Sequence, residues 1–133
     1  MQKTFILATA LTISLSSTGL AQFVPTLGED TPRVCPQQPQ EPDWIASIDI
    51  REAHKGNLVQ LMYRAQGLEA VATSNDCSCE TRFPSWEAAQ QYYYEHYADL
   101  ERWEVLEKID EYRRAANAHR KVAQPMCEQQ GNW

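Results

Sequence analysis

Two cysteines one residue apart, Cys77 and Cys79, are the side chains of this sequence best suited to chemistry. Two thiols at this spacing can exchange a disulfide with another protein, or bind a soft metal ion when they are reduced. They can instead each form a structural disulfide with a distant cysteine, which is the interpretation we favour. A bond between Cys77 and Cys79 themselves would close a small, strained ring and would constrain almost nothing of the chain.

The other two cysteines, Cys35 and Cys127, lie far to either side of this central pair. Four cysteines in a short exported chain are typical of two disulfides. We predict that each central cysteine bonds outward to one of the two flanking cysteines, and the sequence leaves open which pairs with which. The alternative framework has a Cys35–Cys127 bond together with a Cys77–Cys79 bond.

Residues 1–21 have the composition of a secretory signal peptide. A lysine precedes an apolar run over 5–15, and Gly19 and Ala21 occupy the small-residue positions before a cleavage site. An uncleaved anchor is the alternative, but the run is shorter than the roughly 20 residues that a membrane-spanning helix needs. We therefore expect cleavage before Gln22, no stable membrane anchor afterwards, and a periplasmic or secreted protein.

Residues 22–42 contain five prolines, and proline is excluded from helix interiors and central strands. We predict an extended proline-rich arm here, tied to the body of the protein through Cys35. The remaining residues, 43–133, have helical periodicity without strand-like alternation, so they predict a small all-α domain. This disulfide-tied domain has either two long helices or three shorter ones.

The first helical pattern runs from Asp43, a good N-cap residue, to about residue 73. Gly56-Asn57 lies inside it, and because glycine lowers helix propensity, a kink or a break into two helices there is an alternative to one continuous helix. We expect Leu61 and Leu68 to be buried in the core. They belong to an apolar face with spacings of three and four, which consists of Ile50, His54, Leu58, Leu61, Ala65, Leu68 and Ala72.

The second helical pattern begins with Ser85 as its N-cap and continues to about residue 122. Its apolar stripe drifts in phase near Ala98-Asp99, where Asp99 could cap a new helix. One unbroken helix would carry Cys127 far from the central cysteines, so outward disulfides require the chain to fold back there. Pro125 predicts a further break. The stripe consists of Trp86, Ala89, Tyr93, Tyr97, Leu100, Trp103 and Leu106, of which we expect Tyr93 and Leu100 to be buried.

Three consecutive tyrosines, Tyr92, Tyr93 and Tyr94, lie in the second helical pattern. Neighbouring residues on a helix point about 100° apart, so these three rings cannot all face one core. Tyrosine and tryptophan are enriched at protein interfaces. We therefore treat Tyr92, Tyr94 and Trp133 as candidate interface residues.

The charge and the absence of catalytic motifs restrict the function. A formal net charge of −6 argues against nucleic acid as a partner, since nucleic acid rewards clustered lysine and arginine. The sequence lacks a nucleophile elbow, a phosphate-binding loop and a nucleotide-binding fingerprint, so we do not expect an enzyme. The histidines have no metal-ligand spacing, so we expect neither a metal nor another cofactor.

The leading hypothesis is a small, non-enzymatic periplasmic or secreted protein that binds another protein of the cell envelope. An accessory subunit of a secretion or conjugation assembly is one form that such a protein takes, by analogy of fold alone. The alternative is a thiol–disulfide or metal-handling protein that uses the Cys77-Ser78-Cys79 pair.

Overall fold

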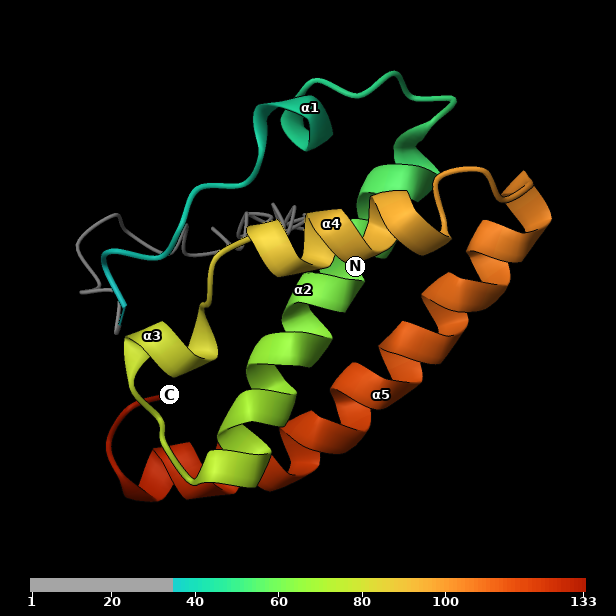
Figure 1. Ribbon diagram of the computed structural model, residues 1–133. Coiled ribbons are helices and arrows are strands. Elements are labelled where there is room, and N and C mark those ends of the chain that lie inside the picture. Colours follow the sequence, from blue (N-terminus) through green and yellow to red (C-terminus); the bar gives the residue numbers. More distant parts are fainter. Residues whose placement is uncertain (1–34) are drawn as a thin grey trace, which may run out of the picture. The chain divides into compact units, whose positions relative to one another are not determined.

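The computed structural model describes residues 35–133, which contain five helices and no strand (Figure 1). The prediction of an all-α, disulfide-tied domain is therefore confirmed. The predicted signal peptide and most of the predicted arm lie outside the described residues. The helices are α1 (Asp43–Ala46), α2 (Ala53–Ser74), α3 (Cys79–Arg82), α4 (Glu87–His96) and α5 (Arg102–Gln129).

The two long helices, α2 and α5, form the framework of the domain and lie side by side, while α3 and α4 pack on another side of α2 (Figure 1). The main core fills the space between α2, α4, α5 and the short α1. A second, smaller cluster lies where α2 ends and α5 approaches its C-terminus, and it consists of Val71, Cys77, Ala123 and Cys127. The main core consists of Ile45, Leu58, Val59, Met62, Tyr63, Ala89, Tyr93, Val105 and Ile109.

The predicted first helix is divided, and the division falls earlier than Gly56. Helix α1 ends at Ala46, and α2 begins at Ala53. Asp43 is the first residue of α1 and provides no side-chain cap, so its prediction as an N-cap is wrong. Gly56 lies buried inside α2, where a Cβ atom would come within 3.2 Å of the Ile45 side chain. The glycine therefore makes room for α1 to pack back onto α2 instead of breaking the helix.

The buried face of α2 also differs from the predicted stripe. Ile50 precedes the helix and is 86% exposed, while Leu61 and Leu68 are only half-buried. The fully buried side chains of α2 are Leu58, Val59, Met62 and Val71. Helix α2 contacts α5 on one side and α3 and α4 on another, so its buried surface is wider than a single stripe.

The fold-back predicted near Ala98-Asp99 is confirmed, because α4 ends at His96 and α5 begins at Arg102. The cap of α5 is Glu101, which forms a reciprocal capping box with Glu104, so Asp99 is not the cap.

The break changes which residues of the predicted stripe reach the core. Tyr93 is buried as expected, and Leu100 is half-buried. Trp103 and Leu106 are exposed, while Val105 and Ile109 face inward in their place. At the start of α4, the Ser85 hydroxyl accepts a hydrogen bond from the Glu87 N–H at 3.1 Å, although the helix itself begins at Glu87.

Pro125 lies inside α5, so the predicted break at this residue is wrong. Proline in a helix interior removes one backbone hydrogen bond and costs about 3 kcal/mol. The helix nevertheless continues to Gln129, and the turn after the proline contains Cys127, which is bonded to Cys77. We attribute the continuation to this bond, which fixes the last turn against the end of α2.

Gly67 is the point at which α2 approaches α3 most closely. A Cβ atom at this position would collide with the Arg82 carbonyl oxygen and would lie 3.5 Å from the Pro84 ring. The colliding atom belongs to the backbone, so no side-chain rotation can relieve the contact. Gly67 therefore fixes where α3 and Arg82 lie relative to α2.

We predict that Gly67→Ala lowers the free energy of unfolding by about 1–2 kcal/mol, because a clash with backbone belongs at the upper end of the roughly 1–3 kcal/mol that overpacking costs. The gain of about 1 kcal/mol in helix propensity offsets part of that cost. Denaturant unfolding followed by circular dichroism measures the change. Glu69→Ala, at an exposed position of the same helix, is the control and should change stability by no more than about 0.5 kcal/mol. A Gly67→Ala protein as stable as the parent would contradict the close approach.

Candidate functional site

The four cysteines form the outward pairing that the sequence predicts. Cys35 is bonded to Cys79 and Cys77 to Cys127, with Cα–Cα distances of 5.4 and 5.5 Å. One bond fastens the end of the arm to the first residue of α3, and the other fastens the last turn of α5 to the loop between α2 and α3. No free cysteine occurs in residues 35–133, so the Cys77-Ser78-Cys79 segment does not present a dithiol.

Asp76 organises the loop around the paired cysteines. Its carboxylate accepts hydrogen bonds from the Thr81 hydroxyl at 2.5 Å, the Ser78 N–H at 2.9 Å and the Ser78 hydroxyl at 3.0 Å. These hydrogen bonds lower the pKa of Asp76, and the bond from Thr81 has the largest effect. The Ser78 hydroxyl in turn accepts from the Thr81 N–H and caps α3. The loop thus holds α3, with Arg82 in its last turn, in a defined position.

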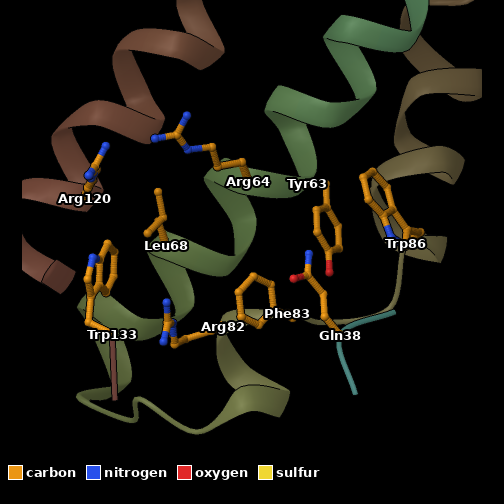
Figure 2. Close-up of a pocket in the computed structure, with 9 residues that line it drawn as sticks. All are labelled: Gln38, Tyr63, Arg64, Leu68, Arg82, Phe83, Trp86, Arg120 and Trp133. Carbon is orange, nitrogen blue, oxygen red and sulfur yellow. The ribbon is translucent and has the colours of Figure 1, made fainter. Parts of the chain in front are cut away.

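Beside this loop lies a hollow of about 460 Å³, which we call the arginine pocket (Figure 2). Its walls come from α2, α3, α5, the start of α4 and the two ends of the described chain. Its volume falls in the range of about 300–1,000 Å³ that is usual for ligand sites. The lining residues are Gln38, Tyr63, Arg64, Leu68, Arg82, Phe83, Trp86, Arg120 and Trp133.

Arg82 is the most constrained of the three arginines of the pocket. Its guanidinium lies 4.7 Å from the centre of the Trp133 ring and 5.2 Å from that of Phe83. It also donates a hydrogen bond to the Asn132 carbonyl oxygen at 2.7 Å. Partial burial lowers the pKa of Arg82, because the charged form is disfavoured away from water. The side chain is therefore a fixed cation with two aromatic neighbours.

Arg64 and Arg120 add two further cations to the same pocket, from α2 and α5. Within residues 35–133, none of the three arginines forms an ion pair with a carboxylate. The Arg120 Nε donates to the Gln124 side chain at 3.0 Å, which leaves its charge uncompensated. In a chain with net charge −6, the pocket thus gathers three arginines that form no ion pair within the described residues.

The opposite end of the pocket is aromatic. The rings of Tyr63 and Trp86 stack with centroids 3.7 Å apart and planes 9° from parallel. The Trp86 indole donates to the Pro39 carbonyl oxygen at 3.4 Å. Tyr63 is only 6% exposed, and its buried hydroxyl has no hydrogen-bond partner among the described residues. Burial raises the pKa of Tyr63, and the hydroxyl is a polar group that a ligand or a water molecule could satisfy.

Trp133 folds back onto the body and becomes part of the pocket. The preceding Asn132 anchors it, since the Asn132 N–H donates to the Cys127 carbonyl at 2.8 Å and its side chain donates to the Cys77 carbonyl. Trp133 also packs against the small cluster that contains both of these cysteines. The second disulfide therefore positions one wall of the pocket.

Tyr92 and Tyr94 lie away from this site and do not form one surface with each other. Their side chains are 43% and 56% exposed, and positions two apart on a helix point about 200° apart. Tyr92 contacts His96 and Tyr97, whereas Tyr94 contacts Trp44. They remain candidate interface residues, and the structure joins neither of them to Trp133.

Sequence reasoning missed the arginines and Tyr63. Arg64, Arg82 and Arg120 come from three separate helices, and no spacing in the sequence connects them with one another. Only the packing of α3 against Gly67 and the return of the tail bring them together. The one available signal was Trp133, which was noted without its arginine neighbours.

The fold and the pocket define a small helical protein whose two disulfides hold an arginine-rich, aromatic-lined site. Comparison of the chain with protein-family models, with curated proteins and with solved structures gives no match. Over residues 35–133, no helix has the length and apolar composition needed to cross a membrane. In the same residues, no three histidine, cysteine, aspartate or glutamate side chains are grouped to hold a metal ion.

We predict that Tyr63→Phe leaves the free energy of unfolding unchanged or raises it by up to about 1 kcal/mol, because it removes a buried hydroxyl that has no partner within residues 35–133. Tyr112→Phe is the matched control. Its hydroxyl hydrogen-bonds that of Tyr97 at 3.2 Å, so the change should cost about 0.5–1.5 kcal/mol. Urea unfolding of both variants gives the comparison. A loss above about 1 kcal/mol for Tyr63→Phe would show that its hydroxyl is bonded.

Proposed function

We propose that this protein is a non-enzymatic, exported recognition protein that binds another protein of the cell envelope, as an accessory subunit of a larger assembly would. The observation that supports this most is the arginine pocket, in which three cations lie beside aromatic rings without a carboxylate partner in the described chain. Arginine and aromatic side chains are the residues that most often dominate binding energy at protein interfaces.

The framework around the pocket also supports a recognition role. One disulfide ends at the first residue of α3 and the other in the loop just before it, so α3 and the end of α5 are covalently fastened beside the pocket. A site with fixed walls loses little conformational entropy when it binds a partner. Two disulfides are also typical of proteins that work in an oxidising compartment outside the cytosol.

The thiol–disulfide and metal-handling alternative gains no support from the described residues. It requires Cys77 and Cys79 to act as a pair, and each is bonded to a different, distant cysteine. Cys77 and its partner Cys127 are both buried, which removes that bond from easy attack by an external thiol.

Site-specific photo-crosslinking in the native host tests the proposal. A photoreactive amino acid replaces Gln38, which is exposed at the pocket, or Glu107, which is exposed on α5 and does not line the pocket. We expect the Gln38 position to give a discrete crosslinked product with an envelope protein, identified by mass spectrometry. The Glu107 position should not give that product. Exported, folded protein that forms no product at Gln38, or the same product at both positions, would contradict a partner-binding pocket.

A further inference from the structure

We infer that the arginine pocket recognises an acidic peptide segment, in which two or more carboxylates lie beside an aromatic or aliphatic side chain. This inference rests on the proposed function and specifies its chemistry. It assigns the three arginines to the carboxylates and the Tyr63–Trp86 end of the pocket to the apolar side chain.

The charges of the pocket select the carboxylates. Arg64, Arg82 and Arg120 all line it, and no carboxylate within residues 35–133 pairs with them. The planar guanidinium matches a carboxylate with two parallel hydrogen bonds, which are stronger than bonds between neutral groups. A long polyanion such as nucleic acid is disfavoured, because the chain as a whole carries a net charge of −6 and would repel it outside the pocket.

The arrangement of the side chains favours a peptide segment with an acidic part and an apolar part. Figure 2 shows two groups of side chains with Phe83 between them: Tyr63, Trp86 and Gln38 toward one side, and Arg64, Arg82, Arg120, Leu68 and Trp133 toward the other. A lone carboxylate or phosphate would occupy the cationic side and leave the aromatic side empty. A peptide that carries both acidic and apolar side chains fills both.

Two uncharged polar groups at the aromatic end suit the backbone of a peptide. Among the described residues the buried Tyr63 hydroxyl has no hydrogen-bond partner, and the Gln38 side chain lines the same pocket. A peptide backbone offers both a donor and an acceptor at every residue. A carbonyl or N–H group of the ligand would supply the Tyr63 hydroxyl with the partner that residues 35–133 do not provide.

The Arg82 guanidinium already has a fixed position in the protein without a ligand. Its contacts with Trp133 and Phe83 and its hydrogen bond to the Asn132 carbonyl hold the guanidinium in place. These contacts use the ring faces and one N–H group, and they leave other donors of the guanidinium for a carboxylate. Ordering of the side chain is therefore part of the folded state and adds little to the cost of binding.

Binding of synthetic peptides to the folded, oxidised protein tests the inference. The probes are hexapeptides with two glutamates and one phenylalanine in every arrangement on a glycine and serine background, each with a glutamine counterpart. Isothermal titration calorimetry gives the dissociation constants. We expect at least one acidic peptide to bind roughly 10-fold or more tightly than its glutamine counterpart, and to weaken as salt screens the charges. Removal of its phenylalanine should also weaken it.

Matched variants locate the binding. Arg64→Gln and Arg120→Gln remove exposed cations, and each should weaken the best acidic peptide by about 10-fold or more. Arg82→Lys keeps the charge, loses the planar fork and should also weaken it. Arg114→Gln removes an exposed cation of α5 that does not line the pocket, so it should change the affinity less than 2-fold. Circular dichroism verifies that each variant is folded.

Three results would overturn the inference. They are equal affinity for the acidic peptides and their glutamine counterparts, an effect of Arg114→Gln as large as that of Arg64→Gln, and displacement of the peptide by inorganic phosphate at equal concentration. The last result would indicate a site for simple anions. A partner crosslinked at Gln38 together with no preference for acidic peptides would leave the proposed function intact and refute only this inference.

Discussion

The pairing of two disulfides around one short loop is the constraint on which the rest of this structure depends. Cys77 and Cys79 are separated by one residue, and their bonds run to opposite ends of the described chain. In the chain-entropy view, closing loops of 44 and 50 residues removes freedom from the unfolded state worth roughly 4 kcal/mol each. One bond fixes the first residue of α3 and the other fixes the turn of α5 that follows Pro125.

Much of the fold was predictable because cysteine spacing and helical periodicity are local signals. Outward bonding of the two central cysteines required the chain to fold back near residue 98, and the helices do divide between His96 and Arg102. The buried face of α2 was harder to predict. A prediction of a single apolar stripe assumes that the helix packs against one neighbour. Helix α2 packs against α3, α4 and α5, so a different set of its side chains is buried. Leu61 and Leu68 are therefore less buried than Val59 and Met62.

The candidate site was not predictable from the sequence, because its residues lie far apart in the chain and only the fold brings them into one pocket. Arg64, Arg82 and Arg120 are unremarkable where they stand in the chain, and Tyr63 is one of six tyrosines. Gly67 lets α3 approach α2, and Asn132 turns the tail back over Cys77, so that the three cations meet beside aromatic rings. The result is a concentrated positive site on an acidic protein.

The central claim is that the bonds Cys35–Cys79 and Cys77–Cys127 hold the walls of this pocket in place. Disulfide mapping of the exported protein tests it most directly, with partial reduction and stepwise alkylation to separate the two central cysteines, followed by mass spectrometry. The account predicts these two pairs and no free thiol among the four cysteines. A Cys35–Cys127 peptide together with a Cys77–Cys79 bond, or a Cys35–Cys77 peptide, would contradict it.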